Sequence, residues 1–325
     1  MLEEFDYHLP KERIAQQPTL PRDKCKFLVL NCDKIEHRIF HEIVDYLHEG
    51  DALVLNDSKV IKARIFGRKE TGGKIELLLL GKKDGYYECL VGGKVREGTK
   101  FYAGKYEGKI ISKHDGRCLV ELPITIEEWE KLGKMPTPPY IKKEIENDDW
   151  YQTVYARKKG SIAAPTAGLH FTSSLLKKIK NMGVEIVYIT LHVGLATFLP
   201  VKSLQQKMEK EYFYISEEAA MKINEAARVI AVGTTVVRAL ESASENGITR
   251  AKHGYTDIFI RPGYKFKSSI KGLITNFHMP KSSPLLLVSA FAGREKIMKA
   301  YEEALNRDYR FLSFGDAMLI LKCSN

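Results

Sequence analysis

The sequence contains no stretch that approaches the roughly 20 consecutive apolar residues of a membrane span. Its first residues, MLEEFDYHLP, are acidic and have no apolar core of the kind that a secretory signal requires. Internal repeats and low-complexity tracts are also missing. These absences predict a cytoplasmic protein that has no membrane partner.

Motifs for common cofactors and crosslinks are missing too. No G-x-G-x-x-G or G-x-x-x-x-G-K-[ST] occurs, so neither a dinucleotide nor a nucleoside triphosphate is indicated. There is no H-E-x-x-H zinc motif. The cysteines are odd in number and widely spaced, without a C-x-x-C pair, which predicts reduced thiols. They are Cys25, Cys32, Cys89, Cys118 and Cys323.

The sequence is rich in basic residues, which are unevenly distributed. The chain has 325 residues and a net charge of +10. Residues 1–60 carry −4, residues 61–150 carry +3 and residues 151–325 carry +11. A positive field attracts polyanions such as nucleic acid, although a lysine-rich solvated surface gives the same count. The length fits two domains, or one domain with an insertion.

Short strands separated by glycine-rich turns begin at Val60. Their spacing of about ten residues is typical of a small antiparallel barrel or sandwich. The candidates are Val60–Phe66, Lys74–Leu80, Tyr86–Val91, Lys100–Tyr102, Lys109–Ser112 and Arg117–Glu121. We therefore predict that residues 61–150 form an inserted β domain.

Helices and strands alternate in the chain outside this insertion. Such alternation indicates an α/β sandwich with a mainly parallel or mixed sheet. Residues 1–60 and 151–325 are therefore predicted to form one discontinuous α/β domain that carries the chemistry. Within it we expect a helix at Lys11–Gln17 and a strand at Thr256–Ile260.

Three histidines follow strands or small-residue turns in this domain. His170 ends the small-residue run SIAAPTAGLHF, which also holds Thr166 and Gly168, and His192 and His278 each follow an apolar strand. Strand ends gather along one edge of a doubly wound sheet, so the three can share a crevice. An imidazole there suits general acid or base catalysis. The alternatives are a tight packing turn and hydrogen-bonded structural histidines.

Further strand ends suggest a binding site. The strand in VIAVGTTVVRALE ends at Gly233 and opens into a helix at Thr234 and Thr235, with Arg238 one turn later. A helix N-terminus of this kind favours anionic groups, including carboxylates, unless it is an ordinary threonine cap. Other polar or small residues at such turns are Asn56, Asp57, Gly194, Thr197 and Asn276.

Blocks along nearly the whole chain resemble one family, in the same order. They include FDYHLP, IAQQP, LVLNDSKVIKARIFG, TGGKIELLLL, AAPTAGLHFT, LHVG, VIAVGTTVVRALES, TNFHMPKS and YRFLSFGDAML. The family is that of the S-adenosylmethionine:tRNA ribosyltransferase-isomerases of queuosine biosynthesis. The resemblance implies an α/β/α sandwich domain with an inserted small antiparallel β-barrel.

It also implies a reaction. The ribosyl moiety of S-adenosylmethionine would be moved onto 7-aminomethyl-7-deazaguanine at the tRNA wobble position and rearranged to epoxyqueuosine, with release of adenine and methionine. S-adenosylmethionine would be a consumed substrate, and no cofactor or metal would be needed. The tRNA partner would be the anticodon stem-loop, and we expect a monomer.

For this reaction we assign His170 and His192 as the candidate acid/base pair, with His278 and Thr166 as further catalytic candidates. The substrate-binding candidates are Asn56, Asp57, Arg64, Gly168, Gly194, Thr197, Gly233, Thr234, Thr235, Arg238 and Asn276.

The sequence departs from the family pattern at two positions. Glu209 follows Met208 where a histidine is usual, with Glu211 retained, and Ala196 replaces a usual glycine. These departures keep open an RNA-binding homologue with altered catalysis. A metal-dependent hydrolase built on the three histidines is a third hypothesis, although none of them is spaced as H-x-x-x-H.

Overall fold

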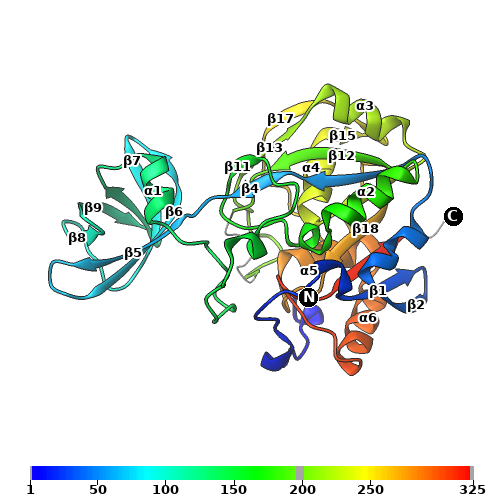
Figure 1. The fold of residues 1–325 in the computed structure, drawn as a ribbon, viewed down its shortest axis with the longest axis horizontal. Coiled ribbons are helices and arrows are strands. Elements are labelled where there is room, and N and C mark those ends of the chain that lie inside the picture. Colours follow the sequence, from blue (N-terminus) through cyan, green and yellow to red (C-terminus); the bar gives the residue numbers. More distant parts are fainter. Residues whose placement is uncertain (1, 195–200, 323–325) are drawn as a thin grey trace. The chain divides into compact units, whose positions relative to one another are not determined.

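The computed structural model describes residues 2–194 and 201–322, which form two units (Figure 1). The large unit contains Met1–Lys59, Pro138–Lys158 and Ala164–Asn325. The barrel unit contains Val60–Thr137 and Lys159–Ala163. The predicted Thr197 site and the Ala196 departure lie outside the described residues.

The large unit is built on a nine-stranded mixed sheet. Its strands are β1 (Lys26–Asn31), β2 (Lys34–Ile39), β3 (Asp51–Asn56), β12 (Glu185–Leu191), β13 (Glu211–Ile215), β14 (Arg228–Val232), β17 (Lys252–Thr256), β18 (Ile270–Asn276) and β19 (Ala317–Leu321). In space they follow the order β17-β13-β12-β3-β14-β18-β19-β1-β2. The four strands β12, β3, β14 and β18 are parallel neighbours, and β13 and β17 extend the sheet antiparallel.

The parallel strands are short apolar runs because both faces of the sheet are covered. Every residue of β3 is buried, and in β14 only Arg228 is partly exposed. Continuous apolar runs of this kind are typical of parallel strands between helices. On one face, Phe171 packs edge-on against Phe40 with ring centroids 4.9 Å apart, within a core that also holds Leu175 and Ile179.

Several helices of the large unit begin after a residue whose side chain caps them. The helices of this unit are α2 (Ser173–Asn181), α3 (Glu217–Glu225), α4 (Thr234–Ala243), α5 (Ser283–Ala292) and α6 (Arg294–Asn306), with 3₁₀ turns η1 (Leu2–Phe5), η2 (Lys11–Arg13), η3 (Arg22–Lys24), η4 (Phe40–Tyr46), η5 (Asp148–Tyr151) and η6 (Thr166–His170). The side chains of Thr172, Ser216 and Ser282 accept hydrogen bonds from the first turns of α2, α3 and α5, as N-caps do. α4 has no side-chain cap.

The barrel unit is a closed antiparallel barrel. Its strands are β5 (Arg64–Lys69), β6 (Lys74–Lys83), β7 (Tyr86–Gly92), β8 (Lys100–Ala103), β9 (Tyr106–His114) and β10 (Arg117–Glu121), in the order β10-β7-β6-β5-β8-β9. Helix α1 (Ile126–Leu132) buries Trp129, whose indole N–H donates to the Ala63 carbonyl at 3.2 Å. The predicted fold class, an α/β domain with an antiparallel β-barrel, is confirmed.

Two short pairings complete the described secondary structure. β4 (Ser58–Val60) pairs with β11 (Lys158–Ser161), and β15 (Ser244–Glu245) pairs with β16 (Ile248–Thr249). Among the described residues, no helix is both long and apolar enough to span a membrane. Cys25, Cys89 and Cys118 are free thiols.

Two of the local predictions were wrong. The expected helix at Lys11–Gln17 is a single 3₁₀ turn, Lys11–Arg13. No strand forms over the expected range Thr256–Ile260, because the strand at this place, β17, ends at Thr256. The Thr256 hydroxyl accepts a hydrogen bond from the Ile258 N–H at 3.3 Å, so a local turn replaces further strand pairing.

Candidate active site

Four parallel strands deliver polar residues to one edge of the large unit's sheet. β12 is followed by His192, β3 ends at Asn56, β14 is followed by Gly233, and β18 ends at Asn276, two residues before His278. Because neighbouring parallel strands end at the same edge, loops at their carboxyl ends form the usual ligand crevice of an open α/β sheet.

A small cleft, partly open to solvent, lies at this edge. Its lining includes hydroxyls, small residues and one imidazole. The residues are Tyr140, Ala164, Pro165, Thr166, Ala167, Val193, Gly233, Thr234, Thr235, Thr275, Asn276, Phe277, His278, Met279, Ser282, Pro284, Leu312 and Ser313.

The N-terminus of α4 forms part of this lining. Gly233 precedes the helix with φ of +94°, a left-handed conformation that glycine adopts without strain. No side chain caps the helix, and the Val236 N–H donates to the Gly233 carbonyl at 3.1 Å, so the N–H groups of the first two helical residues are the ones left for a ligand. Thr234 and Thr235, the first two residues of the helix, both line the cleft, so this wall favours a carboxylate or another anion.

His278 is the histidine that lines the cleft. Its Nε2 lies 2.8 Å from the Thr275 hydroxyl, and its backbone N–H donates to the Tyr301 hydroxyl at 3.0 Å. The Tyr7 hydroxyl donates to its carbonyl. Burial lowers the pKa of His278 to about 3, so the imidazole is neutral near pH 7.

His170 lies behind the cleft, packed in the core. Its ring centroid is 5.1 Å from that of Phe40, and its Nδ1 is 3.3 Å from the Cys25 sulfur. Burial lowers the pKa of His170 to about 4, and the nearby Asn276 side chain opposes the shift. Asn276 itself lines the cleft and donates to the Leu312 carbonyl at 2.9 Å. His170 therefore adjoins a cleft residue without lining the cleft itself.

His192 is half-buried beside the cleft. Its ring stacks on Tyr212 with centroids 5.8 Å apart. Burial lowers the pKa of His192, and the Asp57 carboxylate opposes this shift. The following residue, Val193, does line the cleft.

Asn56 and Asp57 hold the strand ends in place. The Asn56 side chain accepts from the Leu191 N–H at 3.0 Å and donates to the Leu191 carbonyl at 2.9 Å. It also donates to the Thr235 hydroxyl at 3.4 Å. Asp57 accepts from the Thr190 hydroxyl at 2.7 Å and pairs with Arg157 at 3.1 Å. Asn56 therefore links β12 to the start of α4.

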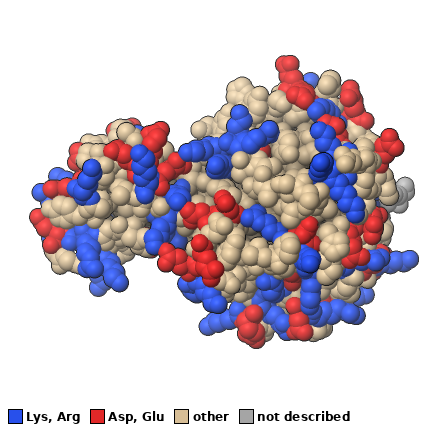
Figure 2. All heavy atoms as spheres, viewed as in Figure 1, with Lys and Arg blue, Asp and Glu red and all other residues tan. Residues whose placement is uncertain are grey.

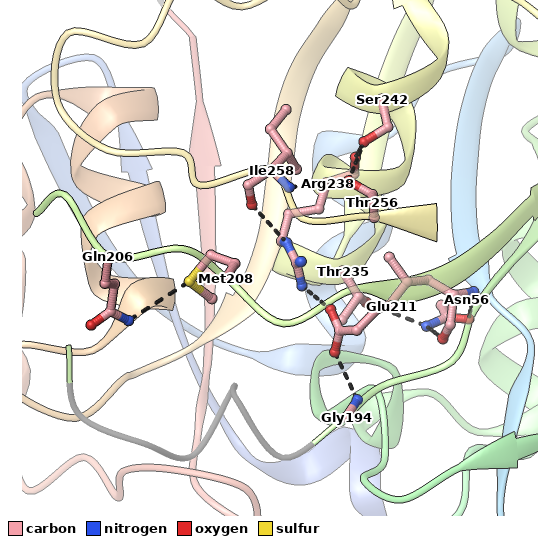
Figure 3. A network of polar contacts seen from close by, with 11 residues as sticks. Asn56, Gly194, Gln206, Met208, Glu211, Thr235, Arg238, Ser242, Thr256 and Ile258 are labelled. Carbon is pink, nitrogen blue, oxygen red and sulfur yellow. Dashed lines mark hydrogen bonds and ion pairs between the residues drawn. The ribbon is translucent and has the colours of Figure 1, made fainter. Parts of the chain in front are cut away.

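Arg238 is engaged in a buried ion pair with Glu211 (Figure 3). The side chains are 11% and 3% exposed. The other Glu211 oxygen accepts from the Gly194 N–H at 2.7 Å, and Arg238 Nε donates to the Ile258 carbonyl at 3.4 Å. This network joins β13, α4 and the turn after β12, so Arg238 is placed to position backbone around the site.

The remaining predicted residues have local roles. A Cβ on Gly168 would lie 2.0 Å from the Tyr155 hydroxyl, so this close approach requires glycine. Arg64 belongs to β5 of the barrel unit, where it pairs with Glu76 at 2.9 Å and donates to the Thr137 carbonyl at 2.9 Å. Met208 is buried and, with Arg238, lines a smaller pocket next to α4.

The structure thus brings some of the predicted residues together. Those that line the cleft are Thr166, Gly233, Thr234, Thr235, Asn276 and His278. Sequence reasoning missed the hydroxyls of Tyr140, Thr275, Ser282 and Ser313, which also line it. Thr275 and Ser282 flank His278 in TNFHMPKSS, a signal that was available. The catalytic and binding roles stay predictions.

No group of three or more His, Cys, Asp or Glu side chains in the described part of the chain is arranged to hold a metal ion.

Residues 2–320 match the family described as "Queuosine biosynthesis protein". The S-adenosylmethionine:tRNA ribosyltransferase-isomerase of Thermosipho melanesiensis is 52% identical, and that of Desulforamulus reducens is 50% identical; each match covers 98% of this chain and 99% of the relative. The crystal structure of an S-adenosylmethionine tRNA ribosyltransferase from Thermotoga maritima is similar, with a TM-score of 0.58 and 39% identity over 98% of this chain and all of that one.

We predict that Glu211→Gln destabilises the protein, because it leaves the Arg238 guanidinium buried without its counterion. The free energy of unfolding in urea should fall by about 3–5 kcal/mol. Replacing both partners, Glu211→Leu with Arg238→Met, should recover much of this loss. Glu218→Gln removes a carboxylate from an exposed pair with Lys222 and should cost nothing measurable. Equal stability of the Glu211 and Glu218 variants would contradict this role.

The pKa of His170, about 4, also predicts a pH dependence of stability. In the unfolded chain the His170 imidazole takes up a proton near pH 6.5, whereas in the folded protein it does so only near pH 4. The free energy of unfolding therefore has its full value above pH 6.5 and decreases as the pH falls from 6.5 towards 4. Between pH 7 and pH 5 the loss from this group should be about 2 kcal/mol. Urea unfolding at both pH values should show a flatter dependence for His170→Gln than for the wild type. His41→Gln, at an exposed histidine, should keep the wild-type slope; an unchanged slope in His170→Gln would refute the assignment.

Proposed function

The chain belongs to the queuosine biosynthesis protein family, and we propose that it is an S-adenosylmethionine:tRNA ribosyltransferase-isomerase. In this reaction the ribosyl moiety of S-adenosylmethionine is transferred to 7-aminomethyl-7-deazaguanine at the tRNA wobble position. Its rearrangement gives epoxyqueuosine, and adenine and methionine are released. Sequence identity of about 50% to these enzymes, over almost the whole chain, is the observation that carries this proposal.

The cleft suits the methionine end of the substrate. A carboxylate bound at the uncapped N-terminus of α4 would accept hydrogen bonds from free backbone N–H groups and interact with the positive end of the helix dipole. Thr235, held by Asn56, adds a hydroxyl beside that position. Arg238 is paired with Glu211, so in this proposal it supports the helix and the backbone donors bind the carboxylate.

The reaction needs a base for a carbon-bound proton beside the sulfonium, and a proton donor for the departing adenine. His278 is the imidazole in the cleft lining, and its position is fixed by Thr275 and Tyr301, so it is the candidate for the first task. Thr166 and Ser282 supply hydroxyls in the same cleft. His170 and His192 stay candidates that would act from behind and beside the cleft.

The remaining parts of the proposal concern partners and location. The tRNA is recognised through its anticodon stem-loop, which the excess of basic residues attracts. S-adenosylmethionine is consumed as a substrate, and neither a cofactor nor a metal takes part. The protein acts as a monomer in the cytoplasm.

The test of this function is release of free adenine. Incubation of the protein with S-adenosylmethionine and tRNA bearing 7-aminomethyl-7-deazaguanine should liberate adenine and shift the mass of the modified base to that of epoxyqueuosine. Guanine-bearing tRNA should give neither product. Binding of tRNA without adenine release over many turnover times would refute the enzyme and favour an RNA-binding homologue.

We expect His278→Ala to lower kcat for adenine release by about a hundredfold or more, the usual contribution of a general acid or base. Affinity for tRNA should be unchanged within about twofold in a binding titration, because the substitution removes a proton-transfer group. His41→Ala, at an exposed histidine outside the cleft lining, should retain full activity. A kcat near that of the wild type in His278→Ala would exclude His278 as the base.

A further inference from the structure

One end of the large sheet presents aromatic side chains on a single face. The antiparallel register places Tyr212 opposite Tyr255 and Tyr214 opposite His253, and Tyr214 also lies opposite Thr190 of β12. Side chains alternate between the two faces along a strand, and paired residues lie on the same face. The residues paired with Tyr212 and Tyr214 therefore share one face of the sheet with the even-numbered positions of β12. The aromatic face consists of Tyr188, His192, Tyr212, Tyr214, His253 and Tyr255.

The rings in its centre contact one another. His192 stacks on Tyr212 with an interplanar angle of 22°, and Tyr212 meets Tyr255 edge-on with centroids 5.7 Å apart. In the middle of β12, the Tyr188 ring lies under the Arg157 guanidinium, which is 4.4 Å from the ring centroid. The contacts from His192 to Tyr255 form a continuous row across three strands.

This face differs from its reverse in burial. On the reverse side of β13, Phe213 and Ile215 are each 1% exposed, and Glu211 bonds to Arg238 of α4. On the aromatic face, Tyr214 is 43% exposed and Tyr255 is 70% exposed. Helix α4 therefore covers one side of β13 and β17, while the large rings on the other side meet solvent. A group of exposed rings is typical of a binding surface.

Basic side chains surround the aromatic face. Lys210 precedes β13, and Lys158 follows Arg157; all three cations have exposed positions. Figure 2 shows Lys and Arg side chains gathered over the part of the large unit where Figure 1 labels β11 and β13. Exposed rings among cations suit unpaired nucleotides, whose bases stack while their phosphates are neutralised.

The aromatic face leads directly to the cleft. His192 belongs to the row of rings, and the next residue, Val193, lines the cleft. Glu211 connects the aromatic face to the cleft. Its carboxylate accepts a hydrogen bond from the Gly194 N–H in the turn beside the cleft, and it precedes Tyr212 on β13. Nucleotides that stack on the rings would thus flank a base that enters the cleft.

We propose that the aromatic face, centred on Tyr212 and Tyr255, stacks unpaired bases of an RNA loop and presents a neighbouring base to the cleft. This rests on the proposed function, for which the RNA is the anticodon loop of the substrate tRNA. The rings provide stacking that tolerates any base, and Arg157, Lys158 and Lys210 provide the charge.

The test measures binding of a fluorescently labelled anticodon stem-loop RNA by anisotropy at fixed salt. Tyr255→Ala and Tyr212→Ala should each weaken binding about tenfold, the usual loss for one stacked base. Tyr255→Phe and Tyr212→Phe keep a ring and should bind within about twofold of the wild type. Thermal unfolding of each variant confirms that it is folded. Met221→Ala, at an exposed apolar residue of α3, is the matched control and should bind like the wild type.

A salt titration separates stacking from charge. The alanine variants of the tyrosines should keep the wild-type dependence of affinity on salt, whereas Lys210→Ala should reduce its slope. Alanine variants that bind RNA as tightly as the wild type would overturn the proposal and leave a protein partner as the occupant of this face. Failure of the wild type to bind the RNA would also overturn it. Adenine release, measured separately, tests the proposed function independently of this result.

Discussion

The arrangement around the cleft depends on one buried ion pair, between Glu211 and Arg238. Two opposite charges removed from water are costly unless each is satisfied, and here the second carboxylate oxygen binds the Gly194 N–H. The pair therefore fixes α4, β13 and the turn after β12 in one geometry. Since α4 begins at the cleft and β13 carries Tyr212 on its other face, the same interaction sets the position of the binding wall and of the rings beside it.

Burial governs the chemistry of the histidines more than neighbouring charge does. It lowers the pKa of His278 to about 3 and that of His170 to about 4. Both rings are therefore neutral at physiological pH, although their surroundings differ: hydroxyls and open space for His278, a thiol and an aromatic ring for His170. The uncapped N-terminus of α4 adds a positive potential. Together these features suit an anion next to an unprotonated base.

The sequence predicted the architecture well because periodic apolar runs and turn residues are local signals. The barrel strands and the strand-to-helix junction at Gly233 were recognisable in this way. The cleft was only partly predictable, since a small-residue run such as the one before His170 looks the same whether it packs in a core or lines a site. Which side of a strand end faces the cleft depends on register between distant segments, so Thr275 and Ser282 were missed. The ion pair of Glu211 could not be predicted from local sequence, because its partner Arg238 lies 27 residues away. Only the family motif pointed to Glu211.

The interrupted course of the chain has a consequence for biosynthesis. β1 pairs with β19, its partner from the far end of the chain, and β3 pairs with β12 and β14. β1 can pair early with its neighbour β2, but its other edge waits for β19, and both edges of β3 wait for β12 and β14. The barrel strands, which are made in the meantime, pair within Arg64–Glu121. Non-local pairing is slow because a long loop must first close. The nascent chain must therefore keep one edge of β1 and both edges of β3 unpaired while the barrel is made, which makes these strands the segments most in need of a chaperone.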